Sequence, residues 1–310
     1  MTVPLSRSFW IRALITAGVL SLILWKVDGR EALRAIARLD LRVLLLVGAL
    51  LVVDRALMVW RWIALLRAAG QPISTKSATW IYLVSSFVGG FLPAGVGADL
   101  ARAYTLTQRT SQGGAAIASV AADRLLGLIS ILLVGLFGAV SWQRGADGNT
   151  VLMSGAVLGV FASIAFLWAD SWVRAVMPHA LRERRIGIRA LRYADALSAY
   201  RGHRGTIALV LTLSIGVQLL RILQAYLLGQ GIGIDVPFGY YLVFMPIGLL
   251  ALLLPISISG FGAPQALMVW LLTPVGVPEA DAFALTTLVV LSGIVSNLPG
   301  AILYLRQKKA

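Results

Sequence analysis

The sequence predicts an all-α polytopic membrane protein, built as an inverted repeat with two re-entrant broken hairpins that meet near the midplane. The first observation is composition: 59% of the 310 residues are hydrophobic and 13% are charged, whereas about a quarter of a soluble domain is charged. The second is that two apolar stretches each contain a break, one at Leu92-Pro93 and the other 162 residues later at Leu254-Pro255. The third is that both breaks have the same order of apolar segments around them.

The first break lies in residues 85–104, SSFVGGFLPAGVGADLARAY. The stretch starts apolar, breaks at Gly89-Gly90 and at residues 92–97, and resumes as a helix that carries Asp99 and Arg102. Proline removes a backbone donor, and glycine permits backbone angles that other residues avoid. Since broken backbone at membrane depth must be buried or line a wet cavity, we expect a re-entrant hairpin. The alternative is an ordinary spanning helix with a proline kink.

Other windows reach the roughly 20 apolar residues that a membrane span needs. These windows are residues 41–66, 117–142, 150–168, 207–228 and 283–305, with residues 10–25 as a short first span before them, while residues 238–254 enter the membrane and meet the second break. We expect residues 10–25 to be a retained span and not a signal peptide. Residues 150–168 contain Gly155 and Gly159 in a GxxxG spacing, which favours close helix packing.

Two polar segments lie between the spans. Residues 26–40 place Arg30, Arg34 and Arg38 at helical spacing on one face, which predicts a helix in the membrane interface. Residues 170–205 contain eight arginines and predict surface helices. Because basic loops face the cytoplasm, this segment and both termini are predicted inside, and the loops 229–237 and 273–281, which lack Lys and Arg, outside. Residues 26–40, with four basic residues, then face outward and do not fit this rule.

The whole chain, 1–310, is predicted to form a single transmembrane domain. Its first repeat covers residues 1–142, and its second covers 149–306, including the arginine-rich segment 170–205. In this topology the first hairpin opens to the cytoplasm and the second to the outside. Inverted repeats with broken helices near the midplane are typical of secondary transporters, which bind substrate at the repeat interface.

Three motifs resemble one known family. LPAGVGADLARAY, AADRLLG and LPISISGFGAPQALMVWLL are similar to the transmembrane domain of the lysylphosphatidylglycerol synthase (multiple peptide resistance) family. The resemblance implies a flippase-like protein of the bacterial inner membrane that moves anionic phospholipids, polyprenyl-phosphate-linked lipids or hopanoid-type lipids between leaflets. The aminoacyl-transferase domain of that family has no match here, so lipid lysylation is not expected. The family's usual Arg-Glu pair after the second hairpin is replaced by Pro264 and Gln265.

A lipid translocator needs a polar path and groups that neutralise a phosphate. A helix that starts after Gly97 would direct its N-terminal donors at the midplane, and arginine binds phosphate through two parallel hydrogen bonds. The candidate substrate-binding residues are Arg102, Asp99, Asp123, Arg124, Arg55, Arg221, Gly95, Gly97, Ser257 and Ser259, and the hairpin residues are Pro93, Pro255, Gly260 and Gly262. The aspartates would hold the arginines, neutralise the empty site or take up protons.

The alternative reading of these charges is structural, since paired charges inside a membrane also serve packing alone. Asp54 and Arg55 lie at mid-span, Arg61 is expected to extend toward the nearer membrane surface, and Asp123 and Arg124 are expected about one turn into the membrane. Ser257 and Ser259 either line the outer half of the path or satisfy the broken backbone.

Several chemistries are not expected. The chain has no cysteine and only two histidines, both in the polar arginine-rich segment, so no metal site or cofactor is predicted. We find no nucleophile with a neighbouring base, and the net charge of +14 indicates contact with anionic headgroups rather than nucleic acid. A lipid translocator that is not an enzyme is therefore favoured, with membrane lipids as partners. The alternatives are an intramembrane enzyme that acts on a lipid phosphate and an accessory subunit that binds lipid-synthesis enzymes through the arginine-rich segment.

Overall fold

The computed structural model describes residues 29–71, 73–90, 97–110, 113–142, 157–161, 198–252 and 262–307, with the single residues 175, 177, 178 and 191. Within these ranges the secondary structure is helical, and four stretches are long and apolar enough to cross a membrane: Leu41–Ala68, Gly113–Ser141, Arg204–Gly231 and Glu279–Arg306. The prediction of an all-α polytopic membrane protein is confirmed.

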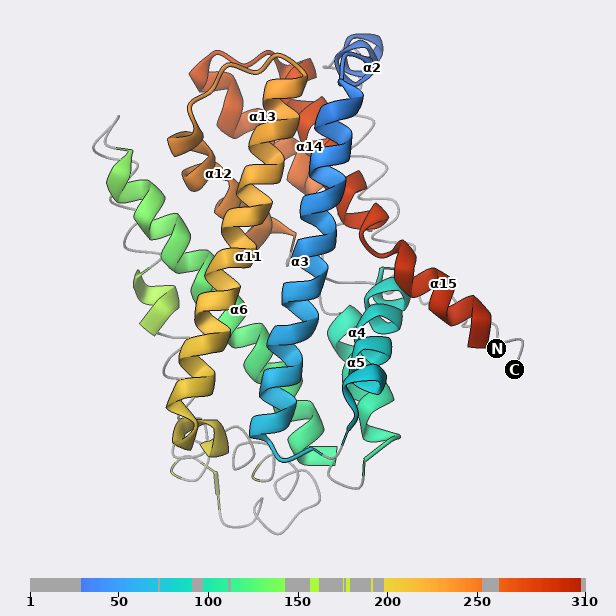
Figure 1. Cartoon of the computed structure of the whole chain (residues 1–310). Coiled ribbons are helices and arrows are strands. Elements are labelled where there is room, and N and C mark those ends of the chain that lie inside the picture. The colour runs from blue at the N-terminus through green and yellow to red at the C-terminus, as the bar shows by residue number, and fades with distance from the viewer. Residues whose placement is uncertain are drawn as a thin grey trace.

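Two antiparallel helices, α3 (Leu41–Ala68) and α11 (Arg204–Gly231), pack along one another (Figure 1). Each has 28 residues, or about 42 Å at 1.5 Å per residue. At one end Val47 shares an apolar cluster with Ile232, and at the other end Leu65 shares a cluster with Val210. Asp40 begins α3 as its N-cap, because its carboxylate accepts a hydrogen bond from the backbone N–H of Arg42 at 3.0 Å.

The short helices α4 (Thr75–Gly89) and α5 (Gly97–Thr107) pack against each other in the lower half of the view (Figure 1). Ser74 caps α4 by accepting a hydrogen bond from the backbone N–H of Ser77 at 3.2 Å. The two helices touch at backbone level, since a Cβ on Gly89 would collide with the backbone of Ala98. The predicted break at Gly89-Gly90 and the predicted helix from Gly97 are therefore both observed.

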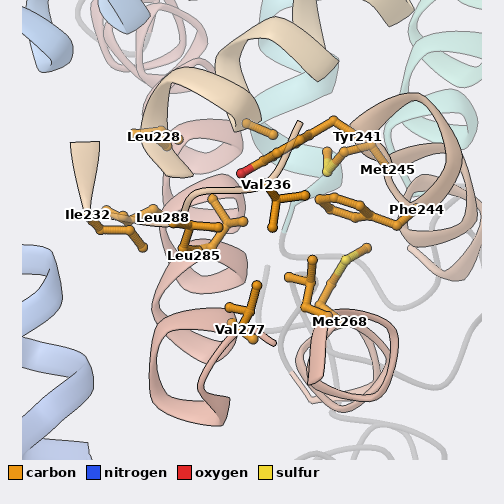
Figure 2. Packing of buried hydrophobic residues seen from close by; sticks show 14 of the residues in the cluster. Leu228, Ile232, Val236, Tyr241, Phe244, Met245, Met268, Val277, Leu285 and Leu288 are labelled. Atoms are coloured by element: carbon orange, nitrogen blue, oxygen red, sulfur yellow. The ribbon is translucent and has the colours of Figure 1, made fainter. Parts of the chain in front are cut away.

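The second pair of short helices, α12 (Phe238–Ala251) and α13 (Ala263–Leu272), lies in the upper half of the view (Figure 1). The 3-10 turn η2 (Thr273–Val275) follows α13 directly. Figure 2 shows side chains of α11, α12, α13 and α14 (Glu279–Val295) pointing toward one another at this end. Phe244 and Leu272 are fully buried there, so one continuous apolar cluster closes this end of the bundle.

One glycine in a neighbouring helix allows each short pair to pack closely against that helix. A Cβ on Gly138 of α6 (Gly113–Ser141) would collide with the carbonyl of Leu242 in α12, and one on Gly300 of α15 (Leu298–Gln307) would collide with the carbonyl of Leu83 in α4. Larger residues at these two positions would separate the helices.

The last span differs from the prediction of one helix over residues 283–305. The structure divides it into α14 and α15, with a turn at Ser296 and Asn297. Pro299 has no N–H to donate to the carbonyl of Val295, and proline disfavours helical angles at the residue before it. Pro299 is therefore the residue in the sequence that predicts this break.

The amphipathic segment predicted in residues 26–40 forms α2 (Gly29–Ala37), which lies at the end of α3 and packs on α14 (Figure 1). Arg34 and Arg38 are exposed, while Ala35 is buried. The predicted spans 10–25 and 150–168 and the arginine-rich segment 170–205 lie largely or wholly outside the described residues. Gly159 is described, and its Cα faces Leu132 of α6.

The other end of the bundle is fixed by the 3-10 turn η1 (Ala199–Gly202). The Tyr200 hydroxyl donates a hydrogen bond to the backbone carbonyl of Leu65 at 3.1 Å and is buried against the end of α3. Burial raises the pKa of Tyr200 above its ordinary value, so the hydroxyl keeps its proton and remains a donor at neutral pH.

Candidate functional site

Arg102 is buried where α5 meets α3, α4 and α6. Its guanidinium lies 2.7 Å from Asp99 and 3.0 Å from Asp123. It also lies over the neighbouring rings of Trp62 and Tyr82, at 5.0 and 4.9 Å from their centroids. Two carboxylates and two aromatic faces together offset the cost of burying this cation. The spacing of Asp99 and Arg102 by three residues on one helix makes the first ion pair local.

Arg61 joins three helices. Its Nε donates to the carboxylate of Asp123 at 2.7 Å, and its NH1 donates to the hydroxyl of Ser214 at 2.8 Å. The side chain is 4% exposed, so the expectation that Arg61 extends to the membrane surface is wrong. Arg61 instead pairs with the carboxylate of Asp123, because a buried carboxylate without a partner would be strongly destabilising.

Asp123 is buried in the interior of the bundle. It is 2% exposed and lies about 15 Å along α6 from Gly113. It accepts hydrogen bonds or ion pairs from Arg61 and Arg102, so one carboxylate holds together helices α3, α5 and α6.

Asp99 lies in the first turn of α5, where the helix dipole favours a negative charge. It connects Arg102 to Arg124 of α6, whose NH1 is 2.8 Å from the carboxylate. The Arg124 side chain is 29% exposed, compared with 5% for Arg102. The start of α5 after Gly97 was predicted to attract an anion. The structure shows that the protein's own carboxylate, Asp99, lies in the first turn of this helix.

A second chain of polar contacts crosses between α11, α3 and the turn before α15. The Nε of Arg221 donates to Asp54 at 2.9 Å, Arg55 lies 3.8 Å from the same carboxylate, and Arg55 donates to the Ser296 hydroxyl at 2.6 Å. Asp54 is buried. Each member of the Asp54-Arg55 couple thus has a further partner: Asp54 contacts Arg221, and Arg55 contacts Ser296.

A polar cavity of about 120 Å³ lies between α3, α4, α5, α6 and α11. Its charged lining consists of Arg61, Arg102, Arg124, Arg221, Asp99 and Asp123. Four arginines face two aspartates in the lining, and Arg221 also contacts Asp54 just outside it, so the four described arginines exceed their three carboxylate partners by one positive charge. Gln218 also lines it, and the Oε1 of this buried amide has no hydrogen-bond partner, which leaves an unsatisfied polar group beside the cavity.

The structure thus brings together five of the ten predicted substrate-binding residues, Arg102, Asp99, Asp123, Arg124 and Arg221, and it joins Arg55 to Arg221 through Asp54. Gly97 begins α5 and is buried. Gly95, Pro93, Pro255, Ser257, Ser259 and Gly260 lie outside the described residues.

Gly262 precedes α13 with a φ of +101°, a backbone angle that favours glycine. Its backbone N–H donates to the Oε1 of Gln265 at 2.7 Å, and Gln265 is fully buried. The amide thus supplies the acceptor at this helix start, a role that needs no negative charge. The Nε2 of Gln265 is buried without a hydrogen-bond partner.

Sequence reasoning left Asp54, Arg61, Ser214 and Gln218 out of the site. The signal was present as helical spacing: Asp54 and Arg61 are seven residues apart, as are Ser214 and Arg221, so each pair shares one helix face. Two such polar faces on apolar spans predict that the spans face each other. Among the described residues, no three His, Asp or Glu side chains form a group that could hold a metal ion.

The spans and this buried cluster define the chain as a multi-pass all-α membrane protein with a cationic interior site. It belongs to the lysylphosphatidylglycerol synthase TM region family, whose family model matches residues 9–300. The family resemblance drawn from the three sequence motifs is confirmed, and the family indicates a membrane function connected with lipids. Comparisons with curated proteins and with solved structures give no match.

Proposed function

We propose that this protein is a flippase-like translocator that moves a phosphate-bearing lipid between the leaflets of a bacterial inner membrane. The observation that carries the proposal is the excess of positive charge around the polar cavity beside α5. Each of these arginines contacts a carboxylate, but the arginines outnumber the carboxylates. Excess charge inside a membrane protein is costly, so the cavity favours an anionic occupant. Of the lipid classes named above, this supports anionic phospholipids and polyprenyl-phosphate-linked lipids over hopanoid-type lipids.

The accessible arginines are the best candidates to bind the phosphate. The side chains of Arg124 and Arg221 are 29% and 26% exposed, and both line the cavity. Arg102 and Arg61 are almost fully buried and engaged with aspartates. In this proposal Arg61 and Arg102 position the aspartates. Arg124 and Arg221 bind the phosphate of the lipid.

The proposed architecture is an inverted repeat with re-entrant hairpins. At 1.5 Å per residue, α4 and α12 reach about 22 and 21 Å, too short to cross a hydrocarbon core of roughly 30 Å. Each short pair follows a 28-residue span. The two spans, α3 and α11, begin 163 residues apart, at Leu41 and Arg204. The short helices α4 and α12 also begin 163 residues apart, at Thr75 and Phe238. Gly138 and Gly300, which admit α12 and α4, are 162 residues apart.

The experiment is leaflet exchange of fluorescent phosphatidylglycerol in vesicles that contain the purified protein. We expect the fluorophore of inner-leaflet lipid to become accessible to an impermeant quencher faster than in protein-free vesicles. Phosphatidylcholine, which has no net charge, should exchange more slowly. Exchange at the protein-free rate for phosphatidylglycerol and for a polyprenyl phosphate would contradict the proposal.

The alternative of an intramembrane enzyme is tested on the same vesicles. Mass spectrometry of the lipids before and after exchange distinguishes a change of leaflet from a change of chemistry. We expect unchanged lipid masses. A new lipid species that forms only with the protein would replace the translocator proposal by the enzyme, while binding of a lipid-synthesis enzyme without exchange would favour the accessory subunit.

A further inference from the structure

A second cavity lies on the opposite side of α3 from the charged one. It has a volume of about 610 Å³, and it is lined by residues from Gly48 to Arg67 on α3, from Thr75 to Leu83 on α4, and from Val295 to Pro299 at the turn between α14 and α15. This volume falls within the roughly 300–1,000 Å³ of pockets that enclose small molecules. None of its residues was predicted as a site except Arg55.

The cavity is a long groove that follows the membrane span. Its α3 residues extend over about 29 Å of helix, close to the roughly 30 Å thickness of the hydrocarbon core. Most of its lining is aliphatic or aromatic, and two lining residues, Val52 and Trp60, are 70% and 52% exposed. The groove is therefore open along the outer surface of a span, where the surrounding medium is lipid.

The polar groups of the groove are concentrated at two points. At the end of α3, the exposed Arg67 donates to the hydroxyl of Thr75 at 3.2 Å, and Thr79 lies one turn further along α4. About 18 Å along α3, Arg55 contacts Ser296, and its buried Nε has no hydrogen-bond partner. The end of the groove at Arg67 and Thr75 thus offers a cation and a hydroxyl group. The wall between this end and Arg55 is apolar.

From this arrangement we infer that the groove binds one hydrocarbon chain of an anionic membrane lipid, whose phosphate lies at Arg67 and Thr75. The charge at the end matches a phosphate, and the length and apolar wall match an acyl or polyprenyl chain. The inference rests on the proposed function, because it gives the same class of lipid a second position, on the other side of α3 from the charged cavity. Arg55 joins the two through Asp54 and Arg221.

The test uses a phosphatidylglycerol probe with a photoreactive group in its acyl chain, incorporated into vesicles with the full chain. We expect the probe to label peptides that contain Val52 or Trp60. Gly48→Phe and Ala56→Phe should reduce labelling roughly tenfold, the change expected when about two methylene groups are excluded from an apolar site. A Cβ on Gly48 meets no atom within 4 Å, so the larger side chain enters the groove and not a neighbouring helix.

Matched controls separate the chain from the phosphate. Gly216→Phe fills equally open space on α11, outside the groove, and should leave labelling unchanged. Arg67→Gln should weaken labelling by phosphatidylglycerol but not by a diacylglycerol probe that lacks phosphate, whereas Lys76→Gln, which removes an exposed charge outside the groove, should affect neither.

The outcomes distinguish this inference from the proposed function. Groove labelling without leaflet exchange keeps the groove and rejects the translocator. Leaflet exchange without groove labelling, or labelling that Gly48→Phe and Ala56→Phe leave unchanged, overturns the groove. A photoreactive residue at Val52 that crosslinks to a peptide of this chain, and not to lipid, would also overturn it.

Discussion

Arg102 and Arg124 both contact Asp99, yet their surroundings assign them different roles. Arg102 is buried between two carboxylates and two aromatic rings, whereas Arg124 keeps 29% of its side chain exposed at the cavity. A group that must accept and release a lipid cannot also be fully committed to holding a bundle together. We therefore assign binding to Arg124 and positioning to Arg102, although the sequence motif emphasised Arg102.

Replacing Arg124 tests the binding role. Arg124→Gln keeps a polar but shorter side chain and loses the charge, and a charge-assisted hydrogen bond contributes about 1.5–3 kcal/mol. Phosphatidylglycerol exchange in vesicles should slow about 10–100-fold, while the melting temperature in detergent changes little. Arg306→Gln, at an exposed position in α15, is the matched control and should exchange at the wild-type rate. Normal exchange by Arg124→Gln would remove this residue from the path.

Replacing Asp123 tests the structural role. Asp123→Asn keeps the shape but leaves Arg61 and Arg102 facing a neutral amide in the interior. Loss of one partner from a buried charge pair costs about 3–5 kcal/mol, so the thermal melting temperature and the expression level should both fall. Asp235→Asn, at an exposed loop position, should have neither effect. A stable Asp123→Asn protein that binds lipid but exchanges it slowly would instead assign Asp123 to coupling.

At the scale of helices, backbone contact through glycine decides how the short pairs close. Gly89→Val would push a side chain into the backbone of Ala98, where nothing flexible can yield. Overpacking of this kind costs about 1–3 kcal/mol or more, so we expect a lower melting temperature in detergent and loss of lipid exchange. Gly216→Val, with no atom within 4 Å of the added Cβ, should melt like the wild type. Equal stability of both variants would contradict the close α4–α5 packing.

The helices could be predicted from the sequence to a greater extent than the contacts between them. Apolar length alone predicted α3, α6 and α11, and glycine and proline predicted the ends of α4 and α12. The pairing of Arg61 with Asp123 depends on which helix faces lie together, a tertiary property that joins positions 62 residues apart in the chain. The groove beside Gly48 likewise arises from the space between three elements, which no local sequence pattern encodes.

At the scale of the whole molecule, the two ends of the bundle differ in chemistry. The end formed by α2 and the α11–α12 and α13–α14 connections is closed by the apolar cluster of Figure 2. At the other end, η1 and Arg204 join the arginine-rich segment to α11. Basic segments face the cytoplasm, so the apolar, closed end is expected outside.

Cysteine labelling tests this orientation, because the chain contains no cysteine of its own. Val275→Cys lies exposed at the end of η2, and Gly202→Cys lies exposed in η1. Neither position carries the strain that Gly276→Cys would, since Gly276 has a φ of +86°. An impermeant thiol reagent added to intact cells should label Val275→Cys, whereas Gly202→Cys should react only after the membrane is permeabilised.

Labelling of Gly202→Cys alone would reverse the orientation, and the α4–α5 pair would then open to the outside. Labelling of both variants in intact cells would place η1 and η2 on the same side. The number of crossings between them would then be even, whereas one span (α11) and a re-entrant α12–α13 pair give one crossing, so the re-entrant assignment of α12 and α13 would have to be abandoned.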